Sequence, residues 1–92
     1  MIVSFKDPDA EQLARGRRVR RYVGIERIAR RKLRQLEIAA TLGDLRVPPG
    51  NRLEALRGDR AGQHSIRINE KYRVCFRRTA AGAEDVEIVD YH

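Results

Sequence analysis

The chain has 92 residues, too few for two ordinary domains, so we expect one domain over residues 1–92. Its formal net charge of +7 favours a polyanionic partner, and arginine, the bidentate phosphate binder, outnumbers lysine. Codon usage in a GC-rich genome explains the arginine excess equally well, but not the net charge. No apolar run approaches a membrane span and no secretory leader is evident, so a cytoplasmic protein without membrane contact is expected. One cysteine and two histidines offer no disulfide and no metal site, and we expect no cofactor.

The first predicted elements are a short strand and a capped helix. The stretch IVSF, residues 2–5, is predicted to form a short strand that stops at Asp7 and Pro8. Asp7 can cap a helix whose first residue is Pro8, because proline lacks the amide hydrogen that this position leaves unused. The helix is predicted to continue to Gly16.

An arginine-rich segment, RGRRVRRYVG, follows as residues 15–24. It is either a solvated connector or an arm that binds RNA or the ribosome, and the sequence favours neither interpretation over the other. On the second interpretation, the candidate contacts are Arg17, Arg18, Arg20 and Arg21.

A longer helix is predicted from Ile25, with Gly43 as its expected stop. Its apolar residues have the spacing of one helical face: Ile25, Ile28, Ala29, Leu33, Leu36, Ala39 and Ala40. The stretch 45–62 contains two adjacent prolines and three glycines, which indicates a loop with a short extended piece at 53–56.

The last thirty residues alternate as an antiparallel sheet does. A three-residue loop, 69–71, places Ile66 opposite Val74 and keeps the apolar side chains on one face. The same register puts Arg67 directly opposite Arg73, where like charges destabilise a sheet. Either neighbouring carboxylates or a bound anion is therefore expected beside this pair. On the second interpretation, Arg67 is a further candidate contact with RNA or the ribosome.

A final strand over residues 85–90 is predicted to pair Phe76 with Val86 and Val74 with Ile88. Its C-terminal continuation, Tyr91, is then diagonal to Arg73. Alternation sends Asp90 and His92 to the opposite face, so the three C-terminal side chains converge only if the strand bulges or ends near Asp90.

These side chains suit metal-independent cleavage of RNA, in which the 2′-hydroxyl attacks phosphorus. His92 or Asp90 can exchange protons, and Tyr91 can stack on a base. Arg73 and Arg57 can hold the charged phosphate. Each arginine also has a structural alternative: Arg57 is either solvated or paired with Asp59, and Arg73 is paired with Glu87. His64 and Cys75 are expected to be structural.

Two stretches, LRVPPGNRLEALRGDRAGQHSIRINEKYRVCFRR at 45–78 and DVEIVDYH at 85–92, resemble the HigB toxins of the RelE/ParE superfamily. The resemblance implies a compact α+β fold with N-terminal helices on one face of a curved antiparallel sheet. It also implies a ribosome-dependent endoribonuclease that cuts mRNA in the decoding site. The implied partners are the ribosome and a HigA-type helix-turn-helix antitoxin, through which alone the complex contacts operator DNA.

The resemblance also implies which residues form the catalytic site. Asp90, Tyr91 and His92 match the C-terminal catalytic trio of the family, Arg73 its sheet arginine and Arg57 its basic loop position. Glu54 stands where many relatives have histidine and others have glutamate, as here, so the general base is left open among Glu54, Asp90 and His92. Pairing with Arg52 or Arg57 is the structural alternative for Glu54.

Two other functions are compatible with a basic chain of this size. A toxin like the ParE branch would inhibit DNA gyrase without cutting RNA, but it has no need of a terminal acid–base trio. A simple RNA-binding module would need aromatic stacking platforms, and the chain has few aromatic residues and no tryptophan.

Overall fold

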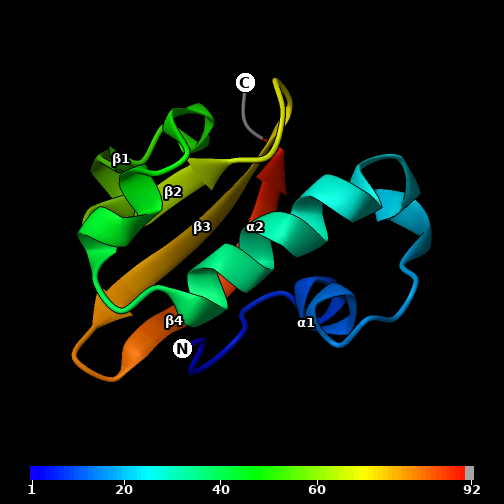
Figure 1. The fold of residues 1–92 in the computed structure, drawn as a ribbon, viewed down its shortest axis with the longest axis horizontal. Coiled ribbons are helices and arrows are strands. Elements are labelled where there is room, and N and C mark those ends of the chain that lie inside the picture. Colours follow the sequence, from blue (N-terminus) through cyan, green and yellow to red (C-terminus); the bar gives the residue numbers. More distant parts are fainter. Residues whose placement is uncertain (91–92) are drawn as a thin grey trace.

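The computed structural model describes residues 1–90, which form two α-helices and a four-stranded antiparallel sheet of order β1-β2-β3-β4. The main elements are α1 (Pro8–Ala14), α2 (Glu26–Ile38), β1 (Glu54–Ala55), β2 (His64–Arg67), β3 (Tyr72–Thr79) and β4 (Gly82–Asp90). Short 3₁₀ turns connect them: η1 (Arg20–Ile25), η2 (Leu42–Arg46), η3 (Pro49–Asn51) and η4 (Gly58–Arg60). Helix α2 crosses the sheet, and α1 lies below α2 in this view (Figure 1). The predicted α+β class, with helices packed on a curved antiparallel sheet, is confirmed.

Helix α1 begins as its sequence predicts. The Asp7 carboxylate accepts a hydrogen bond from the backbone amide of Asp9 at 2.9 Å, and Pro8 occupies the first turn. This bond satisfies one of the amides that the start of a helix leaves without a partner. The helix ends at Ala14, and Gly16 follows with a φ of +84°.

The N-terminal segment is extended but does not form the separate strand predicted for residues 2–5. It makes two isolated parallel bridges to β4, Ile2 with Ala83 and Phe5 with Val86. The bridges lie beside a bulge in the β3–β4 ladder. The bulge is seen as a register shift of one residue between Cys75 and Arg77. Consequently Phe76 and Val86 are not a ladder pair as predicted, although both are fully buried.

Helix α2 ends five residues before Gly43, so the predicted stop is wrong. Thr41 and Asp44 form a reciprocal capping box that begins η2, and this new start competes with continuation of α2. The buried face is also rotated from the predicted one: Ile28 is 40% exposed, whereas the side chain of Lys32 is buried.

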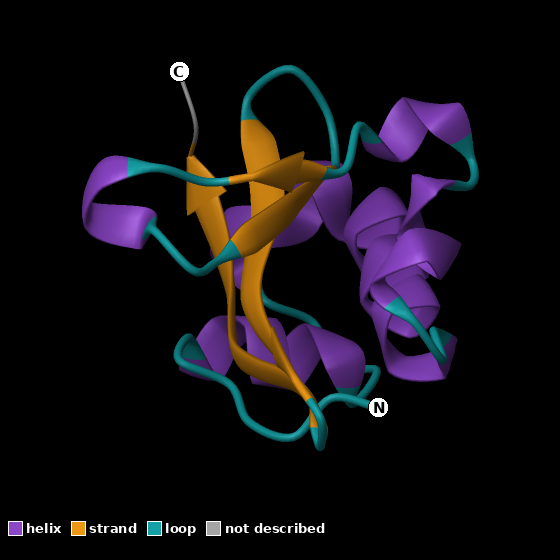
Figure 2. Cartoon of the chain, turned by 90° about the vertical axis from the view of Figure 1, so that its left-hand side faces the viewer, coloured by secondary structure: helices purple, strands orange, loops and turns teal. Residues whose placement is uncertain are grey.

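The core lies between the helices and one face of the sheet. Ile66 and Val74 face each other across β2 and β3, as predicted, and both are fully buried. Leu13 of α1 and Leu33 of α2 belong to the same core cluster. No helix within residues 1–90 is long and apolar enough to cross a membrane. Strand β1 forms one edge of the sheet. Figure 2 shows the strands in the middle of the molecule with helices around them.

Candidate functional site

The face of the sheet away from the core carries a row of polar and charged side chains. Glu54 of β1 faces Ser65 of β2, Ser65 faces Cys75 of β3, and Cys75 faces Glu87 of β4. Ser65 and Cys75 are fully buried. They form the floor of the row, with one carboxylate at each end.

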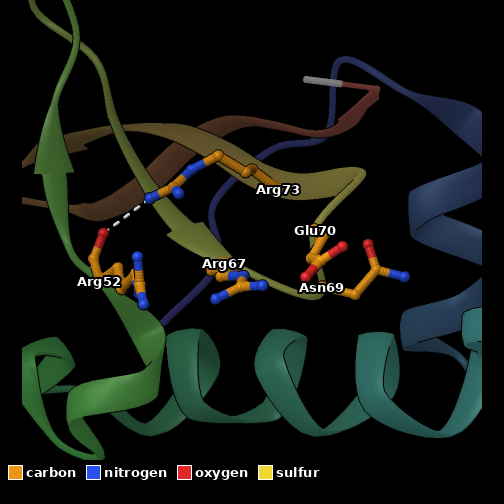
Figure 3. Close-up of a pocket in the computed structure, with 5 residues that line it drawn as sticks. All are labelled: Arg52, Arg67, Asn69, Glu70 and Arg73. Atoms are coloured by element: carbon orange, nitrogen blue, oxygen red, sulfur yellow. Dashed lines mark hydrogen bonds between the residues drawn. The ribbon is translucent and has the colours of Figure 1, made fainter. Parts of the chain in front are cut away.

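Arg73 is held in place beside this floor. Its Nε donates to the hydroxyl of Ser65 at 2.7 Å, and its Nη2 donates to the backbone carbonyl of Arg52 at 2.6 Å (Figure 3). Two hydrogen bonds from different nitrogens fix the plane of the guanidinium group. A positive charge fixed before the substrate arrives can stabilise a developing negative charge at little reorganisation cost.

A buried polar cluster fixes the loop that supplies the Arg52 carbonyl. Asn51 is fully buried, and its Oδ1 accepts a hydrogen bond from Nζ of Lys32 at 2.5 Å. Its Nδ2 donates to Oε1 of Gln35 and to the carbonyl of Leu45. Arg52 follows with a φ of +46°, the left-handed conformation that residues other than glycine rarely adopt.

Burial of Lys32, and secondarily the charge of Arg31, lowers the pKa of the Lys32 amine. Sequence reasoning missed both Lys32 and Asn51. A signal existed, because Lys32 lies within the stripe of Ala29, Leu33 and Leu36, where a charged residue requires a buried partner.

The second carboxylate of the row is held by cations. Glu87 accepts a hydrogen bond from Nη1 of Arg60 at 3.2 Å, and Nζ of Lys6 lies 3.7 Å from the same oxygen. Burial raises the pKa of the Cys75 thiol, on which the charges of Arg60, Glu87, Arg73 and Glu54 also act. The thiol therefore stays protonated at neutral pH, in agreement with a structural cysteine.

Glu54 and Arg57 lie near each other in the chain and border one shallow cavity of about 390 Å³. Arg57 is exposed, and within residues 1–90 it makes no ion pair with Asp59. Because Glu54 pairs with Ser65 and Ser65 pairs with Cys75, Glu54 lies on the same face of the sheet as Arg73. Arg57 follows the end of β1 and lies outside the β1–β2 ladder.

Asp90 is the last residue of β4, and its ladder partner is Tyr72 rather than Arg73. Its side chain therefore projects from the face opposite to Arg73, as alternation predicts. The ammonium group of Lys71 lies 3.8 Å from its carboxylate. Tyr91 and His92 lie outside the described residues, so the predicted catalytic trio stays a prediction.

The arginine-rich segment is partly integrated into the fold. Val19, Tyr22 and Ile25 are buried, and the Tyr22 ring packs edge-on against Tyr72 at 5.9 Å. This contact places η1 beside the end of the sheet that carries Arg73 and Asp90.

The four candidate RNA-binding arginines of this segment differ in their contacts. Arg21 makes ion pairs with Asp7 and Asp9, and Arg17 donates to the side chain of Gln12. Arg18 and Arg20 are exposed, and neither has a hydrogen bond or ion pair within residues 1–90. These two are the arginines of the segment best placed for an external anion.

His64 contacts the core as a structural residue does. Its ring stacks on Phe76 with 6.3 Å between centroids and 27° between planes. Within residues 1–90, no cluster of histidine, cysteine or acidic side chains has the arrangement of a metal site.

Comparison with known proteins finds similarity to toxins of type II toxin–antitoxin systems. The model of a family described as the RelE-like toxin of type II toxin–antitoxin system HigB matches residues 5–92. A protein named Toxin HigB-1, from Vibrio cholerae serotype O1 (strain ATCC 39315 / El Tor Inaba N16961), is 42% identical over 78 residues. The aligned part covers 83% of this chain and 82% of that toxin.

Proposed function

The chain belongs to the HigB-like family of RelE-like toxins from type II toxin–antitoxin systems, and we propose that it is a ribosome-dependent mRNA endoribonuclease. Family membership implies an antitoxin partner. The single structural observation that supports cleavage is Arg73, whose guanidinium is fixed by Ser65 and by the Arg52 carbonyl on the same face as Glu54.

Such an enzyme needs no metal if side chains supply the acid, the base and the positive charge. The 2′-hydroxyl of the nucleotide before the scissile bond loses its proton and attacks phosphorus, and the 5′-oxygen then departs with a proton. We assign stabilisation of the five-coordinate phosphorus to Arg73, assisted by Arg57. Glu54 is the proposed general base, because it shares a face of the sheet with Arg73.

The C-terminal residues complete the proposed mechanism on the basis of sequence. His92 is assigned as the general acid and Tyr91 as a stacking partner for a base. Asp90, whose side chain lies on the opposite face, is assigned the orientation of the C-terminus. The site is proposed to act on mRNA in the ribosomal A site, in the cytoplasm.

The proposed macromolecular partners follow from the family and from charge. The net charge of +7 suits ribosomal RNA and mRNA. Neutralisation is assigned to a HigA-type helix-turn-helix antitoxin, and contact with operator DNA to that antitoxin alone.

Controlled expression in bacteria tests the proposal. The wild-type chain should arrest growth, with new mRNA 5′ ends inside translated codons, and co-expression of the adjacent antitoxin gene should restore growth. Arg73→Ala should abolish both arrest and cleavage. Growth arrest with intact mRNA and altered plasmid supercoiling would contradict the proposal and indicate a gyrase inhibitor of the ParE type.

A further inference from the structure

Arg52 has a left-handed backbone conformation although it carries a side chain. Its φ is +46° and its ψ is +56°. Within residues 1–90, Asp85 is the one other non-glycine residue with a positive φ. The left-handed region is unfavourable for residues with a Cβ atom, because this atom lies too close to the following carbonyl oxygen. Such strain persists only where the surrounding structure imposes it, and it is concentrated at functional sites.

The turn before Arg52 imposes this conformation. The backbone amide of Arg52 donates to the carbonyl of Pro49 at 3.1 Å, which closes the turn. The preceding residue, Asn51, is fully buried, and its side chain is anchored to α2 through Nζ of Lys32 and Oε1 of Gln35. The backbone of Arg52 is therefore held from α2 through a buried side-chain amide.

The left-handed conformation directs the carbonyl oxygen of Arg52 at Arg73. Nη2 of Arg73 donates to this oxygen at 2.6 Å (Figure 3). Arg67 faces Arg73 across β2 and β3, as the sequence predicted, and facing guanidinium groups repel each other. The carbonyl oxygen carries the negative end of a peptide dipole, so it favours one orientation of the Arg73 guanidinium beside this second positive charge. The side chain of Arg52 is exposed and takes no part in the bond.

The bond between Arg52 and Arg73 depends on this backbone conformation. An extended residue has a ψ of about +135°, so relaxation of Arg52 from +56° to that value would rotate its carbonyl by roughly 80° and break the bond. The hydroxyl of Ser65 would still accept from Nε of Arg73. Arg73 would then stay in the site, but its guanidinium would be less well fixed.

We propose that Arg52 is a positioning residue that acts through its backbone carbonyl. Its left-handed conformation, imposed by Asn51 and Lys32, orients the guanidinium of Arg73 for stabilisation of the transition state. The inference rests on the proposed function for the identity of the reaction. Because a charge fixed in advance acts on the chemical step, the effect belongs to the cleavage rate and not to ribosome binding.

Substitutions that remove the same charge but differ in backbone preference test this role. Glycine and asparagine accept the left-handed conformation, whereas β-branched valine does not. With toxin in excess over mRNA-programmed ribosomes, the maximal cleavage rate should be about tenfold higher for Arg52→Gly and Arg52→Asn than for Arg52→Val. The toxin concentration that gives half of the maximal rate should be the same for these variants. Arg52→Ala, with an unbranched Cβ atom, should have an intermediate rate.

The side chain of Arg73 gives a readout that does not depend on cleavage. A guanidinium held by hydrogen bonds rotates slowly, so NMR on the full chain should resolve the separate Nη–H signals of Arg73, assigned by their loss in Arg73→Lys. These signals should be resolved in Arg52→Gly and should merge in Arg52→Val. Circular dichroism at the assay temperature checks that each variant is folded, and if Arg52→Val is not, the comparison of Arg52→Gly with Arg52→Ala replaces it.

The matched control is Arg46→Val. It makes the same substitution and the same loss of charge at an exposed residue of η2 whose φ is not positive. This variant should keep the resolved Arg73 signals and should cut at the wild-type rate.

Three outcomes separate the positioning role from the alternatives. Equal cleavage rates for Arg52→Gly and Arg52→Val would overturn it, whatever the Arg73 signals show. Equally slow cleavage by every Arg52 variant would overturn it as well, because the charge of the side chain would then be what matters. If the wild-type chain cuts no mRNA while the Arg73 signals still follow the backbone preference of residue 52, the nuclease is overturned and the positioning of Arg73 by the carbonyl is supported.

Discussion

At the scale of single residues, the position of Arg73 depends on side chains distant in the sequence. Its guanidinium is held by Ser65 and by the carbonyl of Arg52, and Asn51 fixes the loop that presents this carbonyl. Because Asn51 is fully buried and uses both its donor and its acceptor groups, it connects α2 to the proposed site.

Asn51→Ala should lower the free energy of unfolding by about 1–3 kcal/mol, because the buried Lys32 amine loses its acceptor and the Leu45 carbonyl loses a donor. Urea denaturation followed by circular dichroism measures the change. Combining it with Lys32→Met removes the unpaired amine and should recover part of the loss. Strictly additive losses in the double variant would show that the two side chains do not interact.

Some of these residue roles were predictable from the sequence and others were not. The cap at Asp7 depends on neighbours two residues away, and the pairing of Arg67 with Arg73 depends on one short loop. Asn51 and Lys32 are nineteen residues apart, and no local pattern connects them. Tyr91 and His92 remain predictions from sequence alone.

At the scale of elements, the parallel contact of the N-terminal segment with β4 requires a glycine. Gly82 has a φ of +135°, and a Cβ atom there would collide with the carbonyl oxygen of Met1. Both the backbone conformation and the contact exclude a side chain. The alternation within residues 64–77 predicted the β2–β3 register. The parallel bridges join segments about eighty residues apart, which no local pattern connects.

Gly82→Ala should therefore lower the free energy of unfolding by about 1–3 kcal/mol from backbone strain, with the collision adding to this loss. Thermal unfolding measures the change. Gly24→Ala is the matched control, because a Cβ atom there has nothing within 4 Å and its φ is not in the left-handed region. Equal melting temperatures for the two variants would contradict the packing of the N-terminus against β4.

The link between α1 and η1 should be visible in the titration of Tyr22. Burial, together with the nearby Asp7 carboxylate, raises the pKa of Tyr22 from 10.0 to about 12. Between these values the unfolded chain has lost the phenol proton and the native chain retains it. The contribution of Tyr22 to stability is therefore complete below pH 10.0 and decreases as the pH rises through about 12.

A spectrophotometric titration of the phenol groups should show an ionisation near pH 12, and Tyr22→Phe should remove it. If the chain stays folded and no ionisation near pH 12 is lost in Tyr22→Phe, Tyr22 is not packed against Asp7 as described.

At the scale of the whole molecule, the net charge of +7 is not uniformly available to a partner. Arg21 is engaged by Asp7 and Asp9, whereas Arg18 and Arg20 are exposed beside the end of the sheet that carries the proposed site. The composition predicted a polyanionic partner, but only the fold distinguishes structural arginines from available ones.

Association with ribosomes should therefore weaken steeply with salt, and Arg18→Gln/Arg20→Gln should reduce the slope of log affinity against log salt by about 1 to 2. Sedimentation with ribosomes at several ionic strengths measures this slope. The matched control Arg27→Gln/Arg31→Gln, with the same charge loss on exposed positions of α2, should change it less. An equal change in both variants would indicate a uniform charge effect rather than a defined contact.

The central claim is that the fixed charge of Arg73 serves mRNA cleavage on the ribosome. The most direct measurement is the rate at which the purified chain cuts a defined mRNA in a reconstituted translation system, with the 5′ ends mapped by primer extension. The wild-type chain should cut within the A-site codon only when ribosomes are translating, and Arg73→Ala should lower the rate about 10² to 10³-fold. Arg77→Ala, an exposed arginine of the same strand, should cut at the wild-type rate. Cleavage by Arg73→Ala at a rate close to that of the wild type, or intact mRNA with the wild-type chain, would contradict the account.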